Sequence, residues 1–62
     1  MEINEDHKYE IEERIQGILQ DGGEGMHSSD VLDCVYGTVS FEMTEEEKQF
    51  CLKEVKDITG NP

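Results

Sequence analysis

The spacing of the apolar residues is the feature that most constrains how this chain can fold. In the first third of the sequence they recur at i, i+4, i+7 and i+8, at Ile11, Ile15, Ile18 and Leu19. This spacing places four large apolar side chains on one face of an α-helix. We therefore predict a helix over residues 5–20, with Asn4 or Asp6 as its N-terminal cap. Gly22 is predicted to end this helix in a left-handed conformation.

A second helix is predicted where valines recur every four residues, with a leucine beside the first, at Val31, Leu32, Val35 and Val39. Ser28 or Ser29 is predicted to cap it, because a hydroxyl can accept a backbone N–H of the first turn. Asp30 adds an acid that suits the positive end of the helix dipole. Gly37 is predicted to end the helix just after Tyr36.

The segment that follows this helix allows two interpretations. Residues 38–43 alternate in polarity and are rich in β-branched and aromatic residues, which is typical of a β-strand. A single strand has no partner within the chain and would have to pair across a dimer. We favour an extended connector and keep the strand as the alternative.

The third helix is marked by its capping box, Thr44-Glu45-Glu46-Glu47. The Thr44 hydroxyl can accept the backbone N–H of Glu47, and the Glu47 carboxylate can accept the N–H of Thr44. Gly60 followed by Pro62 is predicted to end the helix. Its apolar stripe consists of Cys51, Leu52, Val55 and Ile58.

Three amphipathic helices with short connections predict an all-α fold, a small three-helix domain over residues 1–62. The alternative is an α+β fold with a short strand at about 38–43 that pairs across a dimer. Because the chain begins with Met1 and ends after a helix stop, we expect a whole small protein. The predicted core comprises Ile11, Ile15, Ile18, Leu19, Val31, Leu32, Val35, Val39, Phe41, Cys51, Leu52, Val55 and Ile58.

The charge of the chain excludes several classes of function. It has 16 acidic and 5 basic residues and a formal net charge of −11, so phosphates repel it and direct nucleic-acid binding is not expected. Leu, Ile, Val and Phe make up 14 of the 62 residues, just above the level of about 20% below which a highly charged chain is disordered. Their helical spacing favours a folded state. No apolar run is long enough to span a membrane and no apolar signal core is present, so we expect a cytoplasmic protein.

Residue types that serve catalysis are present, but not at the spacing that catalysis requires. Residues 21–25 lack the Lys-Ser/Thr of a phosphate-binding loop, and residues 21–32 lack the ligands of a calcium loop. His27, Ser28 and Asp30 are types found in hydrolases, but a triad converges from separate segments. We therefore expect no catalysis and no enzyme.

His7, His27, Cys34 and Cys51 are the possible soft-metal ligands. None of them forms a Cys-x-x-Cys or His-x-x-x-His pair, the spacings that bring ligands together before a metal binds. We expect neither a metal nor another cofactor. Cys34 and Cys51 are predicted to be reduced thiols in the core, with a disulfide and a zinc site as alternatives.

Two clusters are candidates for binding a partner. On the first helix, Asp6, Glu10 and Glu13 form a stripe of roughly 10 Å opposite the isoleucines, and Tyr9 lies among carboxylates. On the third helix, Phe50 has glutamates at i−4, i−3 and i+4, and it is either a binding anchor or part of the core. The predicted partner-binding residues are Asp6, Tyr9, Glu10, Glu13, Glu46, Glu47, Phe50 and Glu54.

The net charge exceeds the value of about 2–8 that solubility requires, although self-repulsion opposes folding. We therefore expect a small acidic protein-binding inhibitor or regulator that docks on a basic surface of a partner protein. In its sharpest form it is a DNA mimic that blocks a nucleic-acid-binding site. In size, charge and helicity the chain is similar to small acidic host-takeover or anti-defence proteins of bacteriophages.

Two other hypotheses remain. The chain is either a homodimeric or subunit-type interaction module that uses apolar contacts, through residues 38–43 or the Phe50 face, or a metal-dependent element or enzyme built on its Cys and His residues. A dimer would lose stability on dilution, and a zinc element would lose it on chelation.

Overall fold

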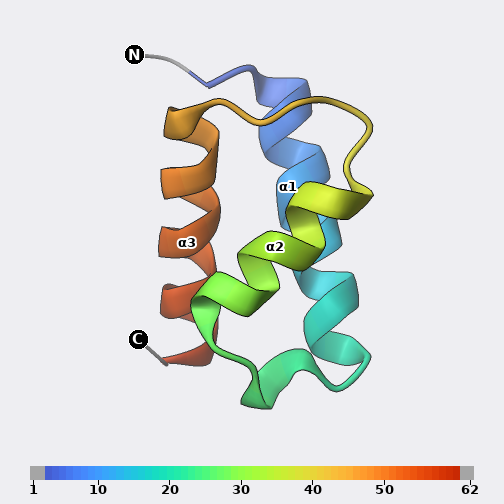
Figure 1. Cartoon of the computed structure of the whole chain (residues 1–62), viewed down its shortest axis with the longest axis vertical. Coiled ribbons are helices and arrows are strands. Elements are labelled where there is room, and N and C mark those ends of the chain that lie inside the picture. Colours follow the sequence, from blue (N-terminus) through green and yellow to red (C-terminus); the bar gives the residue numbers. More distant parts are fainter. Residues whose placement is uncertain (1–2, 61–62) are drawn as a thin grey trace.

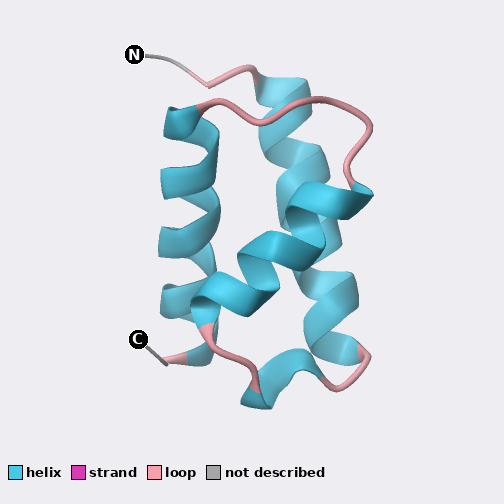
Figure 2. Ribbon diagram, in the orientation of Figure 1, coloured by secondary structure: helices cyan, strands magenta, loops and turns pink. Residues whose placement is uncertain are grey.

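The computed structural model describes residues 3–60, and of Glu24 the backbone alone. Three α-helices follow one another along the chain: α1 (Glu5–Gln20), α2 (Ser28–Thr38) and α3 (Glu45–Thr59) (Figure 1). A short 3₁₀ turn, η1 (Gly23–Gly25), lies between α1 and α2. No residue from 3 to 60 is in a β-strand (Figure 2). The all-α three-helix fold is confirmed, and residues 38–43 do not form the alternative strand.

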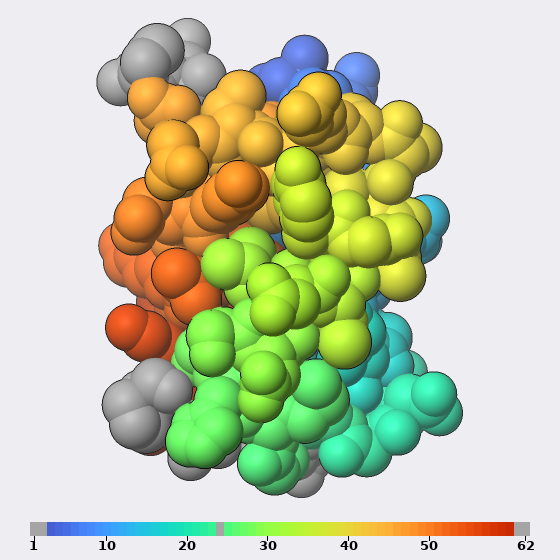
Figure 3. Space-filling model, in the orientation of Figure 1, coloured from blue at the N-terminus to red at the C-terminus, as the bar shows by residue number. Residues whose placement is uncertain are grey.

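The helices α1 and α3 run in the same direction, so that both begin at the same end of the molecule (Figure 1). Between them in sequence, α2 runs back diagonally across the pair and packs against each. Residues 39–44, which we call the connector, pass along the end where α1 and α3 begin. In the space-filling view, α2 and the connector form most of the face toward the viewer (Figure 3). The molecule measures 29 × 20 × 15 Å.

Side chains cap α1 and α3 as the sequence predicts. The side-chain oxygen of Asn4 accepts the backbone N–H groups of Asp6 at 2.8 Å and His7 at 3.3 Å. At α3 both halves of the capping box form: Glu47 N–H donates to Thr44 Oγ1 at 3.2 Å, and Thr44 N–H donates to Glu47 Oε1 at 2.8 Å. These bonds satisfy backbone donors that have no partner within the helix.

Both predicted boundaries of α2 are wrong. His27 is its N-cap residue and makes no side-chain cap, while Ser28 lies inside the first turn and is buried. The extended backbone of a capping residue belongs to His27, with φ −67° and ψ 151°, and Ser28 is already helical, so Ser28 is not the cap. At the other end Gly37 stays helical, and the chain leaves α2 at Val39 with φ −72° and ψ 156°. That exit needs no left-handed residue, so the glycine is not the terminator.

Glycines end the other two helices as predicted. Gly22 has φ +99° after α1, and Gly60 has φ +73° after α3. Pro62, predicted to reinforce the second stop, lies outside the described residues. Gly23 meets a different demand, since a Cβ there would lie 2.7 Å from the backbone oxygen of Ile18. The turn after α1 therefore requires glycine at two successive positions for two different reasons.

The core lies between the three helices and under the connector. Its eight buried apolar side chains are Ile11, Ile15, Leu19, Val31, Val35, Met43, Cys51 and Val55. Four other predicted core residues pack partly buried against it: Ile18, Leu32, Val39 and Phe41. The structure thus confirms the central positions of each predicted apolar stripe.

Three residues differ from the predicted core. Ile58 is 55% exposed, because it lies in the last turn of α3, beyond the buried positions that end at Val55. Leu52 is only half-buried, on the flank of α3. Met43 is buried although it lies outside any helix. Between residues 3 and 60 no helix has the length and apolar character needed to cross a membrane.

Candidate protein-binding surface

Acidic side chains gather at one end of the molecule because α1 and α3 begin there together (Figure 1). The first turns of these helices carry acids that favour the positive ends of the helix dipoles. A pocket of about 250 Å³ at this end is lined by residues before and within both first turns, including Asn4, Glu42 and Glu46. Asp6 and Glu46, predicted on separate helices, therefore lie at the same end. We call it the acidic end and define it as Glu5, Asp6, Glu42, Glu45 and Glu46.

Glu47 is engaged inside the protein. Its side chain is 4% exposed. One carboxylate oxygen accepts the Thr44 N–H, and the other lies 2.6 Å from His7 Nδ1. The His7 ring stacks on Phe41 with centroids 3.7 Å apart. This one carboxylate therefore joins α1, the connector and α3, and it is not available to a partner.

The hydrogen bonds of Glu47 decide its protonation. Burial by itself raises the pKa of Glu47, but the Thr44 N–H and the His7 ring outweigh burial and hold the pKa below its ordinary value of 4.5. Glu47 is therefore ionised at neutral pH and can only accept hydrogen bonds. It follows that His7 Nδ1 carries the proton that it shares with Glu47.

Glu10 also has a structural role. Its two carboxylate oxygens accept the Ser40 backbone N–H at 2.6 Å and the Ser40 hydroxyl at 3.0 Å. The Ser40 N–H is the main reason that the pKa of Glu10 lies below its ordinary value. The predicted stripe on α1 therefore keeps its negative charge. Only the two acids at its ends, Asp6 and Glu13, are exposed and available to a partner. Glu13 pairs with Arg14 at 3.2 Å on the surface.

Tyr9 is the most exposed aromatic side chain of the described chain. It is 70% exposed and lines a shallow depression of about 170 Å³ with Glu12, Glu13 and Gln16. The ring offers a flat apolar face, and the glutamates beside it supply negative charge. Such a face can stack against a guanidinium group while the carboxylates pair with it.

Phe50 lies in a different setting. The ring is half-buried and packs against the core, and Lys8 Nζ of α1 lies 5.5 Å from its centroid. The predicted anchor is thus mainly a core contact on the side of α3 that faces Lys8. Its neighbours Glu46 and Glu54 remain partly exposed.

Few carboxylates are neutralised within the molecule. Among residues 3–60, Arg14 and Glu13 form an ion pair, and His7 Nδ1 lies against Glu47, a contact that is ionic only when the His7 ring is protonated. Two of the lysines instead lie over aromatic rings, Lys8 over Phe50 and Lys48 over Tyr36. Since Glu47 is the only buried acid among the side chains that the structure describes, the negative charge stays at the surface.

The two cysteines lie in opposite environments. Cys51 is buried, and desolvation, with the charge of Glu54, raises the pKa of its thiol to about 11. Cys34 is exposed, so its predicted place in the core is wrong: it lies beside the buried stripe of Val31 and Val35. Both thiols are free. Within the described part of the chain, no three His, Cys, Asp or Glu side chains are placed to hold a metal ion.

Sequence reasoning left several residues out of this surface. Glu12 could have been included, because it lies one turn from Tyr9. Lys8, His7 and Ser40 could not, since their partners lie 30 or more residues away in the sequence. No protein-family model matches the chain, and neither a curated protein nor a solved structure shows significant similarity to it.

Proposed function

We propose that this chain is a small acidic inhibitor or regulator that binds a basic surface of a partner protein and catalyses no reaction. The observation that supports it most strongly is the uncompensated negative charge carried by capped, packed helices. A fixed arrangement of carboxylates can be recognised by its geometry, whereas a flexible acidic tail cannot. Electrostatic complementarity of this kind provides specificity and fast association.

The proposed contact surface is the acidic end together with the exposed side of α1 around Tyr9. Asp6 belongs to both parts, because it lies one turn before Tyr9. Glu10 and Glu47 are excluded because Ser40, Thr44 and His7 occupy their oxygens. Tyr9 would be the aromatic anchor, and the surrounding carboxylates would pair with Arg or Lys of the partner. Phe50 contributes by holding α1 and α3 together, with Glu46 and Glu54 at its rim.

In its sharpest form the proposal is DNA mimicry, in which carboxylates take the place of phosphates on a nucleic-acid-binding protein. The setting would be the cytoplasm of a bacterial cell, with a bacteriophage as the source. This form predicts that duplex DNA and the chain compete for one site. It also predicts that binding weakens steeply with salt, because both ligands act through charge.

Affinity capture from bacterial lysate at about 0.05 and 0.5 M salt, followed by elution with duplex DNA, tests the proposal. Neutralising Glu12 and Glu13 to Gln is expected to weaken binding to the captured protein. The matched control neutralises Asp30 and Asp33 to Asn on α2, which removes the same charge elsewhere. Equal losses in both variants, or an affinity unchanged by salt, would reject docking through this surface.

A further inference from the structure

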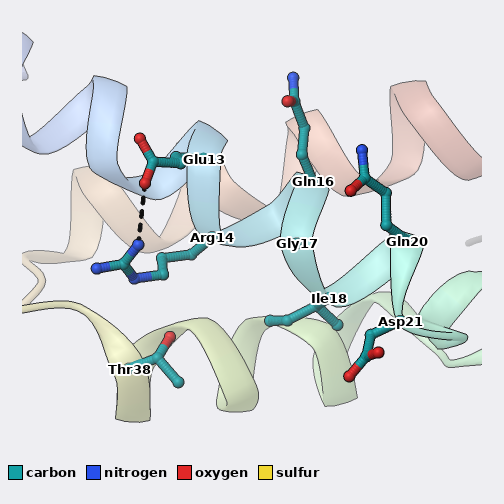
Figure 4. Close-up of a pocket in the computed structure, with 8 residues that line it drawn as sticks. All are labelled: Glu13, Arg14, Gln16, Gly17, Ile18, Gln20, Asp21 and Thr38. Carbon is teal, nitrogen blue, oxygen red and sulfur yellow. Dashed lines mark hydrogen bonds and ion pairs between the residues drawn. The ribbon is translucent and has the colours of Figure 1, made fainter.

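One groove of this acidic molecule is built mainly from acid-free stretches of the chain, and Glu13 and Asp21 are the two acids among its eight lining residues. The two longest stretches without an acidic residue are 14–20 and 34–41. The first forms the second half of α1, and the second includes the last turn of α2. Ile18 and Thr38 bring the two stretches together in an open depression of about 510 Å³ between the helices (Figure 4). The lining carries both signs of charge, because Glu13 and Asp21 are acidic and Arg14 is basic.

The side chains around the depression leave its floor open. Figure 4 shows Arg14 and Ile18 directed toward α2, while Gln16 and Gln20 point away from it. Gly17 lies between them in sequence, in the last turn of α1. A Cβ at Gly17 would meet nothing within 4 Å, and its φ is not positive. Neither packing nor backbone geometry within one copy therefore requires a glycine here, although glycine weakens a helix interior.

A bare helix position has a use when a second helix crosses at that point. The separation of two packed helices depends on the side chains at their contact. With no side chain at Gly17, another helix can approach the α1 backbone closely.

The charges beside the depression indicate that the second helix is α1 of another copy of the chain. Arg14, the only arginine of the chain, lies one turn before Gly17, and Asp21 lies one turn after it; both line the depression. In an antiparallel crossing of two α1 helices about a two-fold axis at Gly17, Arg14 of each copy lies opposite Asp21 of the other. Arg14 pairs with Glu13 of its own copy at 3.2 Å, but an exposed pair of this kind is weak, so Arg14 can also meet Asp21 and the surface is complementary to itself. Because two copies of net charge −11 repel one another, their contact is favoured where acids are fewest.

We propose that the groove between α1 and α2, centred on Gly17, is the interface of a homodimer in which Arg14 of each protomer pairs with the partner's Asp21. The acidic end lies at the beginning of α1 and the groove in its second half, so the acidic end stays open in the dimer, whereas Glu13 and Gln16 line both the groove and the Tyr9 depression. The dimer goes beyond the proposed function and does not depend on it. It would present two acidic ends to a partner.

Sedimentation equilibrium of the full chain, from about 1 μM to 1 mM, measures the dimer directly. We expect its dissociation constant to fall severalfold between about 0.05 and 0.5 M salt, because salt screens the repulsion between copies. This response is opposite in sign to that of docking on a basic partner, so the two proposals can fail separately. A monomer at every concentration in high salt would overturn the dimer and leave the groove to a partner of another composition.

Two sets of variants locate the interface. Gly17→Gln fills the depression and is expected to weaken the dimer at least about tenfold, while circular dichroism shows an intact helical fold. The control Ser29→Gln adds the same side chain at an exposed position outside the depression, and it should leave the dissociation constant unchanged. Dimerisation that survives Gly17→Gln at full strength contradicts this interface.

A charge swap tests the register. Arg14→Asp and Asp21→Arg, each alone, are expected to weaken the dimer, because each places like charges opposite one another. The double variant restores opposite charges and is expected to recover the wild-type constant to within about threefold, as a double-mutant cycle requires for a direct pair. A double variant as weak as the worse single variant rejects the pairing.

Discussion

At the scale of single residues, Glu47 shows how one carboxylate can serve three elements. It completes the α3 capping box, accepts a hydrogen bond from His7 of α1, and thereby fixes the connector on which His7 stacks. The helical wheel places Glu47 next to Glu46, which is partly exposed. Successive residues of a helix differ by about 100° in direction, and this difference buries Glu47 while Glu46 stays partly exposed.

Glu47→Gln is expected to lower the free energy of unfolding by about 1–3 kcal/mol, because it removes charge-assisted hydrogen bonds from a buried site. Urea denaturation at pH 7 measures the change. Glu46→Gln, one position earlier and partly exposed, is the matched control and should change stability by less than about 0.5 kcal/mol. Similar effects of the two variants would show that the His7 contact contributes nothing.

The same residue predicts a pH dependence. Because the folded state lowers the pKa of Glu47 below 4.5, the ionised form stabilises the fold at neutral pH. That contribution is lost as pH falls through the folded pKa. Unfolding measured from pH 7 to pH 3 should show the wild type and Glu47→Gln converging only below about pH 4.5. A stability difference that stays constant over this range would contradict the assignment.

At the scale of elements, the ends of α1 and α3 follow local chemistry, and the glycines in and after α1 have separate roles. Gly22 supplies a left-handed turn and Gly23 a close approach to α1. Gly17 serves neither purpose. Substitution by alanine is therefore expected to change the stability of the protein differently at each of these three glycines.

Gly17→Ala is expected to raise the free energy of unfolding by about 0.5–1 kcal/mol, because alanine favours a helix interior and its Cβ meets nothing. Gly23→Ala is expected to lower it by more than about 1 kcal/mol, since its Cβ would collide with the Ile18 carbonyl oxygen. Thermal unfolding at low micromolar protein concentration measures both. If both variants were equally stable, the close packing of η1 on α1 would be refuted.

At the scale of the whole molecule, a small core holds together a strongly charged surface. Eight buried apolar side chains close the core, and hydrogen bonds donated by the connector to Glu10 and Glu47 hold the connector over its end. Cys51 forms no disulfide, and burial in this core raises the pKa of its thiol. The exposed Cys34 provides an internal reference in the same chain.

A thiol reagent should therefore distinguish the two cysteines. Cys34 is expected to react at once at pH 8, whereas Cys51, buried and with a pKa of about 11, should react only as fast as the molecule opens. Stopped-flow measurement on the wild type and on Cys34→Ser separates the two rates. Immediate reaction of the single thiol in Cys34→Ser would show that the core is not closed.

Local sequence determined that there are three helices and where α1 and α3 begin and end, but not the ends of α2. Capping side chains, left-handed glycines and apolar stripes act within one or two turns, so Asn4, Gly22, Thr44 and Gly60 could be placed from sequence alone. For the same reason the fold class and the centre of the core followed from spacing.

Tertiary structure alone decided which surface residues remain available to a partner. The contacts of Glu10 with Ser40, His7 with Glu47 and Lys8 with Phe50 join residues 30 or more positions apart. They depend on α1 and α3 beginning at the same end, with the connector across that end. Helical periodicity gives the side of a helix on which a residue lies, but not which other element covers it. In the predicted acidic stripe, packing of the helices therefore decides that Glu10 binds the connector while Asp6 and Glu13 stay exposed.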